Sequence, residues 1–61
     1  MRYVTWVDPD ENWNPVKHTA TEEEAIEIMH KVAEQMGKKY SSDEAAFWDF
    51  VVVNWAEIHE A

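Results

Sequence analysis

The stretch that decides the fold is residues 21–37, TEEEAIEIMHKVAEQMG. It begins with Thr21, followed three residues later by Glu24, which is typical of a capping box in which each side chain binds a backbone amide at the helix start. At about 100° per residue, the apolar side chains fall on one broad stripe: Ala25, Ile26, Ile28, Met29, Val32, Ala33 and Met36. Gly37 follows where a left-handed residue commonly ends a helix. The pattern predicts an amphipathic surface helix over residues 21–36.

A second helix is expected over about residues 42–59, opened by a capping box with Ser41 as the cap. Its apolar residues form two groups: a ridge of Phe47, Val51, Trp55 and Ile58, widened by Trp48 and Val52, and a roughly opposite group of Ala46, Phe50 and Val53. A helix that is apolar on nearly all sides has to be buried on nearly all sides. We therefore expect it to lie antiparallel to the first helix and to form a homodimer through Phe50 and Val53. The β-branched run 51–53 also fits a strand, although the ridge and the cap favour a helix.

The residues before the first helix predict a β element over 2–18. Residues 2–7, RYVTWV, are β-branched or aromatic at five of six positions, which is typical of a strand. Residues 8–12, DPDEN, are dense in turn formers, and residues 16–18 can return as a short edge strand. The expected fold class is α+β: a short N-terminal hairpin or strand packed on two antiparallel helices, in a single small domain spanning 1–61.

The charge of the chain limits what it can bind. Thirteen Asp and Glu against five Lys and Arg give a net charge of −8, which opposes direct binding to nucleic acid or to anionic lipid. No cysteine is present, so no disulfide or thiolate metal site is expected. The longest apolar run, residues 50–53, is far shorter than the roughly 20 residues that cross a bilayer. Together with the lack of a signal-peptide pattern, this leads us to expect a cytoplasmic protein with no membrane partner.

No motif for catalysis or for a cofactor stands out. Residues 8–12 begin like a calcium loop, but the sixth and twelfth positions are Trp13 and Thr19 rather than Gly and Glu. Glu27 and His30 have the Glu-x-x-His spacing of di-iron bundles, in one copy only and on the polar helix face. The chain offers no nucleophile with an orienting partner and no phosphate-cradling glycine loop. We expect no enzyme activity, no cofactor and no metal, and a carboxylate/His metal site is a remote alternative.

Three of the four tryptophans divide into two kinds. Trp48 and Trp55 are seven residues apart, share a helix face in this prediction, and are expected in the core. Trp13 lies in a polar turn, where it either folds back over the hairpin or stands out as a binding anchor, because Trp is enriched at interface hot spots. The sequence leaves both readings of Trp13 open.

The excess of carboxylates points to a non-catalytic role in protein binding. Such an excess repels itself and creates a field that steers a basic partner towards the protein. The sharper hypothesis is an inhibitor that mimics nucleic acid in the basic groove of a nuclease or a nucleic-acid-binding protein; an acidic module for another protein target, and a self-assembling subunit, are the alternatives. In size and acidity, though in no motif, the chain resembles the small inhibitors that phages direct against host nucleases and other defence enzymes. The expected partner-binding residues are Asp8, Asp10, Glu11, Trp13, Glu23, Glu27 and Glu34.

Overall fold

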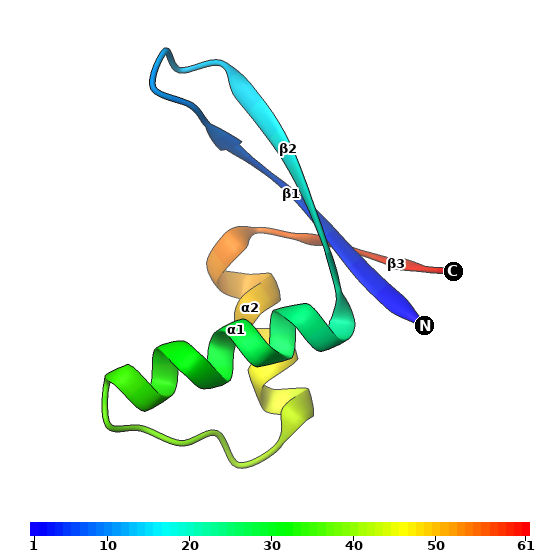
Figure 1. Cartoon of the computed structure of the whole chain (residues 1–61). Helices are drawn as coiled ribbons and strands as arrows, with labels where there is room; N and C mark the ends of the chain where they lie inside the picture. The colour runs from blue at the N-terminus through cyan, green and yellow to red at the C-terminus, as the bar shows by residue number, and fades with distance from the viewer.

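The computed structural model describes all residues, 1–61, and contains three strands and two helices (Figure 1). The elements in chain order are β1 (Arg2–Pro9), β2 (Pro15–Thr21), α1 (Glu22–Gln35), α2 (Asp43–Asn54) and β3 (Glu57–Glu60). The strands form one antiparallel sheet in the order β2-β1-β3. The predicted α+β class and the N-terminal hairpin are confirmed, and β2 is longer than the short return strand that the sequence suggested.

The core lies where one face of the sheet meets the two helices. Val4 pairs with Ala20 on one side and with Ile58 on the other, so these three side chains share a face. Val4 and Ala20 are buried there with residues from both helices: Ala25, Met29, Ala46, Phe47 and Phe50. Only nine of the 61 residues are buried, so much apolar surface remains open.

Helix α1 forms as its local signals predict. Thr21 accepts a hydrogen bond from the Glu24 amide (3.1 Å), and the Glu24 carboxylate accepts one from the Thr21 amide (3.0 Å). At the other end Gly37 has φ +70°, and the Lys38 amide donates to the Ala33 carbonyl (2.8 Å). This is the Schellman arrangement, in which a left-handed residue lets the chain satisfy the last helical carbonyls.

Helix α2 is shorter than predicted, and the expectation of a helix to residue 59 is wrong. Ser42 rather than Ser41 caps the start, accepting from the Ala45 amide. The helix ends at Asn54 because Trp55 turns left-handed, with φ +53°, and the Ala56 amide donates to the Val51 carbonyl (3.0 Å). Residues 57–60 then pair with β1 as the third strand.

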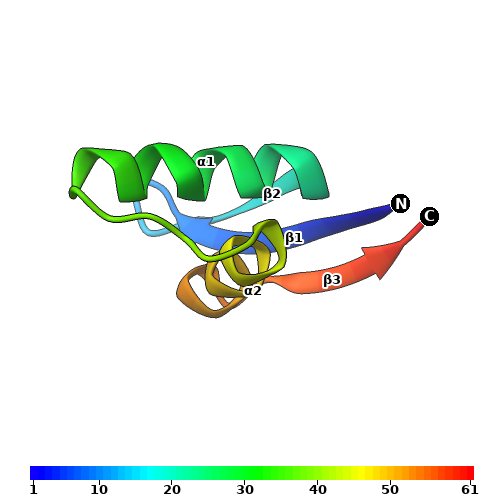
Figure 2. The same cartoon turned by 90° about the horizontal axis from the view of Figure 1, so that it is seen from below.

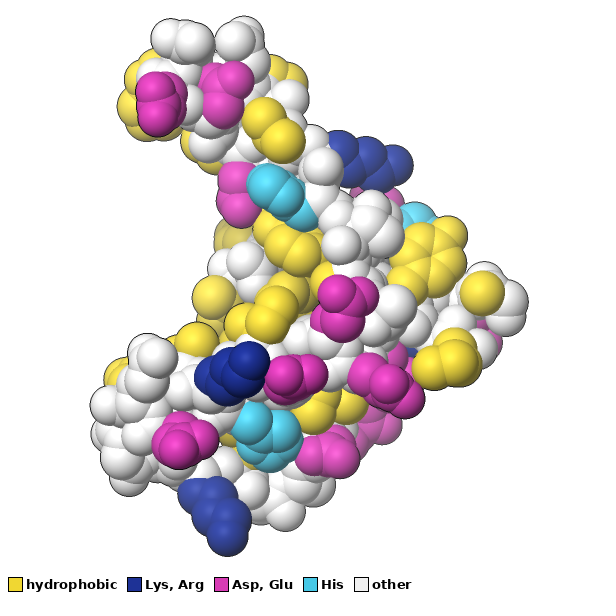
Figure 3. Space-filling view, viewed as in Figure 1, with side chains coloured by type: hydrophobic (Ala, Val, Ile, Leu, Met, Phe, Trp, Pro, Cys, Tyr) yellow, Lys and Arg dark blue, Asp and Glu magenta, His cyan; other side chains and the backbone are white.

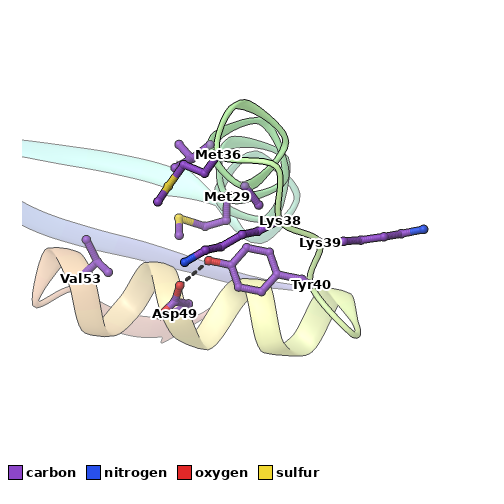
Figure 4. A pocket seen from close by; sticks show the side chains of 9 residues that line it. Met29, Met36, Lys38, Lys39, Tyr40, Asp49 and Val53 are labelled. Carbon is purple, nitrogen blue, oxygen red and sulfur yellow. Dashed lines mark hydrogen bonds between the residues drawn. The ribbon is translucent and has the colours of Figure 1, made fainter.

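The two helices cross steeply instead of lying antiparallel: the view that shows one from the side shows the other nearly end-on (Figures 2 and 4). This crossing buries a different stripe of α2 from the predicted ridge. Ala46, Phe47 and Phe50 face the core, and the ring of Phe50 packs edge-on against Trp6, 5.2 Å between centroids. Phe50 is 3% exposed, so the prediction that it forms a self-association surface is wrong, while Val53 is exposed.

The hairpin of β1 and β2 projects beyond the helices, as Figure 1 shows. The radius of gyration is 12.3 Å, against about 10.5 Å for a compact chain of this length. The tip of the hairpin, residues 10–14, is therefore held away from the rest of the protein.

Neither helix has the length and apolar character that crossing a bilayer would require.

Arg2 ties the sheet to the starts of both helices. Its guanidinium binds the carboxylates of Glu22 (2.5 Å) and Glu44 (2.7 Å) and lies 4.2 Å from the centroid of the Phe47 ring. These contacts raise the pKa of Arg2 further above its ordinary value, mainly through the hydrogen bond to Glu22, and lower the pKa of Glu22. Two of the thirteen carboxylates are therefore used to hold the fold together.

Candidate interaction surface

The hairpin tip is built around Asp10. Its carboxylate accepts hydrogen bonds from the amides of Asn12 (2.8 Å) and Asn14 (2.9 Å), and these bonds, the Asn14 bond most, hold the pKa of Asp10 below its ordinary value. The Asp10 carbonyl accepts from the Trp13 amide at 3.0 Å, closing a tight turn. Asp10 was predicted to bind a partner, and the structure instead gives its carboxylate two bonds inside the loop.

Trp13 follows that turn in the left-handed region, with φ +64°. A left-handed residue after a tight turn is common in hairpin loops of this length and is usually glycine, because a side chain there costs roughly 1–2 kcal/mol. The indole does not recover that cost by packing, since Trp13 is 83% exposed. Of the two readings that the sequence left open, the structure places Trp13 outward.

Asp8 lies at the base of the tip and is held by neighbours. Its carboxylate accepts from the Trp6 indole (3.1 Å) and lies 3.9 Å from His18 Nε2. The Trp6 and His18 rings stack across the two strands, 5.4 Å apart. Strand alternation places Asp8, Trp6 and Val16 on the helix-facing side of the hairpin.

The remaining predicted acids form a row along the outside of α1. Glu23, Glu27 and Glu34 fall within about 40° around the helix axis, and all three are exposed. Glu27 pairs with Lys31 (3.2 Å) one turn later. His30, which lies in the same row, binds Asp43 at the start of α2 (2.8 Å).

Three of the predicted acids have no partner within the protein. The side chains of Glu11 at the tip and of Glu23 and Glu34 on α1 make no hydrogen bond or ion pair. Their carboxylates are exposed and unpaired, so they are free to meet a cation on another molecule. Glu27 is nearly as free, because an exposed pair with Lys31 is worth little.

The tip and α1 can be seen together on one face of the molecule. In Figure 3 acidic side chains lie on the projecting hairpin and over the helical part, and the surface between them is hollowed and carries apolar, histidine and acidic side chains. The two acidic regions are thus the two arms of a concave surface. We call the exposed residues Glu11 and Trp13 of the tip and Glu23, Glu27 and Glu34 of α1 together the acidic face.

The prediction that Trp48 and Trp55 are core residues is wrong. Both were expected in the core, but Trp48 is 47% exposed and Trp55 is 91% exposed. Trp55 lies outside because the helix ends one residue before it, and its left-handed backbone turns the chain towards β3. Nothing local in the segment Asn54-Trp55-Ala56 indicates a helix end, since it contains neither Gly nor Pro.

A groove of about 410 Å³ lies between the end of α1 and α2 (Figure 4). Met29, Met36 and Val53 form its apolar walls, and Lys38 extends across it while Lys39 points away. At its floor the Tyr40 hydroxyl donates to Asp49, and this bond raises the pKa of Tyr40. No buried side-chain nitrogen or oxygen lacks a partner, so the only unpaired polar group at the groove is the exposed ammonium of Lys38.

The structure shows no arrangement that would hold a metal ion. No group of three or more His, Asp or Glu side chains comes together in suitable positions. Glu27 and His30, the remote metal alternative, instead face Lys31 and Asp43. His59, the last histidine, stacks on Tyr3 (4.9 Å) and shares a hydrogen bond with Thr5 (2.8 Å).

Comparison with known proteins adds no assignment. No protein family, no characterised protein and no solved structure matches this chain.

Proposed function

We propose that this protein is a non-catalytic binding module whose acidic face docks on a basic surface of another protein. The observation that carries the proposal is Trp13: a bulky aromatic residue fixed at a glycine-type position, 83% exposed, at the tip of an acidic hairpin. A chain gains no stability from such a residue, whereas an exposed Trp fits the role of an interface anchor.

The charge around Trp13 indicates the chemistry of the partner. Glu11 lies two residues away with no internal partner, and Glu23 and Glu34 on the second arm are equally free. A Lys- or Arg-rich surface would pair with these carboxylates, and an Arg could also stack on the indole. With a net charge of −8, long-range attraction would speed the encounter.

The sharper form of the proposal is an inhibitor that takes the place of nucleic acid. Proteins that bind duplexes collect Lys and Arg in a groove that follows the phosphates. The acidic row on α1 offers carboxylates spaced along a helix, and the hairpin adds a second arm (Figure 3). This protein would therefore occupy the basic groove of its partner and exclude the nucleic acid that the partner binds.

The test is capture on the immobilised protein from nuclease-treated lysate of the native host, followed by elution with duplex DNA. We expect DNA to release nucleic-acid-binding proteins, and high salt to release the same proteins because exposed charge pairs are screened. The double variant Glu23→Gln/Glu34→Gln should lose this capture. Glu57→Gln/Glu60→Gln, which removes the same charge from β3, should keep it.

Two outcomes would overturn the proposal. If DNA releases no captured protein, the nucleic-acid-mimic form is wrong. If the β3 double variant loses as much capture as the α1 double variant, total charge rather than the acidic face is responsible.

A further inference from the structure

Helix α2 carries an apolar strip that nothing in the chain covers. At about 100° per residue, Trp48 and Val52 lie about 40° apart on the side opposite the buried residues Ala46 and Phe50. Trp55 follows the last helical residue and lies near Lys17 and Glu57. Trp48 is 47% exposed, Val52 is 69% exposed and Trp55 is 91% exposed. Figure 2 shows α2 at one boundary of the molecule, with no other element on its side away from α1.

The helix segment that carries the strip also has far fewer charged residues than the rest of the chain. Between Ala45 and Ala56 the only charged residue is Asp49, and its carboxylate is half-buried and bound by Tyr40. In a chain in which 30% of the residues are charged, twelve consecutive positions thus present no free charge. Most of the thirteen carboxylates lie elsewhere, on the hairpin, α1 and β3.

We infer that this strip is the contact through which two copies of the chain associate. Two molecules that each carry −8 repel one another over most of their surface, and an uncharged face is where that repulsion is least. A two-fold contact has to be complementary to itself, which an apolar strip without charge satisfies. Trp48 and Trp55 supply large rings at either end, with Val52 between them. The contact does not depend on the acidic face or on the function proposed for it.

The available area indicates a weak dimer. The exposed parts of these three residues come to about 450 Å² per copy if a Trp offers up to about 250 Å². A standard interface uses about 800 Å² per partner. Val53, although exposed, lines the groove towards α1 and does not enlarge the strip. We therefore expect an equilibrium between monomer and dimer rather than a permanent dimer.

Salt distinguishes this contact from docking to a basic partner. Screening removes the repulsion between two acidic copies and leaves the apolar contact intact, so self-association should become stronger as salt rises. Docking through the acidic face should become weaker over the same range. The two proposals can therefore fail separately.

Sedimentation velocity over a range of concentrations, at low and at high salt, tests the inference. The wild-type mass should move from 7.2 kDa towards twice that value as concentration and salt increase. Val52→Glu should remain a monomer. Ile28→Glu places the same charge at an exposed apolar position on α1 (44%) and should dimerise like the wild type. Far-UV circular dichroism checks that each variant is folded.

If Val52→Glu fails to fold, Trp55→Gly serves instead, because it removes one ring from the strip and introduces a residue suited to a left-handed backbone. It should weaken dimerisation at least tenfold. A wild-type mass of 7.2 kDa at every concentration and salt would overturn the inference. Equal loss of the dimer in Ile28→Glu, or a dimer that persists in both Val52→Glu and Trp55→Gly, would overturn it as well.

Discussion

Replacing Trp13 by glycine should make the protein more stable, which is an unusual expectation for the loss of a tryptophan. The left-handed conformation costs a non-glycine residue roughly 1–2 kcal/mol, and Trp13 has φ +64°. Glycine is more flexible in the unfolded chain, and this reduces the gain in the free energy of unfolding by roughly 0.4–1 kcal/mol. The indole is 83% exposed, so little packing is lost. The net expectation for Trp13→Gly is a gain of about 0.5–1 kcal/mol in the free energy of unfolding.

Trp13→Ala separates the backbone from the side chain. Alanine also resists the left-handed conformation, so this variant should have nearly the wild-type stability while lacking the ring. Urea unfolding followed by far-UV circular dichroism measures both variants without relying on tryptophan fluorescence. Both variants should lose capture of the basic partner to the same extent, because both lack the indole. A loss of more than about 1 kcal/mol in Trp13→Ala would show that the ring packs on the hairpin and would refute the reasoning.

Two further predictions concern stability. Trp55→Gly should raise the free energy of unfolding by about 0.5–1 kcal/mol, measured by urea unfolding at a concentration where the chain is monomeric, and a decrease would show that the ring supports the fold. On acidification, stability should fall below about pH 4.5, because the pKa values of Asp10, Glu22 and Glu24 are lowered in the folded protein by hydrogen bonds. A group with a lowered pKa contributes its stability above its unfolded pKa and loses it as pH falls through the folded value. Glu24→Gln should reduce that acid sensitivity, and an unchanged pH profile in this variant would contradict the assignment.

Helix α1 could be predicted from the sequence because its signals are local. Thr21 and Glu24 are three residues apart, the apolar stripe repeats within the helix, and Gly37 is the residue that a left-handed end prefers. Each feature acts between neighbours in the chain, so no knowledge of distant contacts is needed. The hairpin was predictable for the same reason, since β-branched residues flank a turn rich in Asp, Asn and Pro.

The end of α2 and strand β3 could not be predicted in this way. Trp55 adopts the left-handed conformation at the end of α2, as Gly37 does at the end of α1. A tryptophan disfavours this conformation, whereas a glycine does not. What favours this ending is the pairing of residues 57–60 with β1, more than fifty residues earlier for His59 and Tyr3. A helix continued to residue 59 would leave β1 without this neighbour and would remove Ile58 from beside Val4. The decisive contacts are long-range, and the local pattern favoured the other outcome.

For the candidate site, too, the local features could be predicted from the sequence and the long-range contacts could not. That the chain is acidic and that Trp13 lies in a polar turn were evident from the sequence. Which acids are free was not, because Asp43 is bound by His30 from another helix and Glu44 by Arg2 from a strand. Only the spatial arrangement reduces thirteen carboxylates to the few that pair with no residue of the chain: Glu60 on β3, and Glu11, Glu23 and Glu34 among the predicted acids.

The two most exposed tryptophans indicate two different kinds of partner. Trp13 and Trp55 both occupy left-handed positions, and both are almost fully exposed, so neither residue is explained by folding. Their surroundings differ: Trp13 stands among carboxylates at the hairpin tip, whereas Trp55 follows a helix with no free charge after Glu44 and lies near one cation, Lys17, and one carboxylate, Glu57. Desolvating an unpaired carboxylate is costly, so a face like that around Trp13 requires a partner that supplies cations, whereas the strip around Trp55 requires one that supplies none. A second copy of this acidic chain can meet the strip but is repelled at the tip, and a basic protein is drawn to the tip. Binding at the two tryptophans should therefore respond to salt in opposite directions.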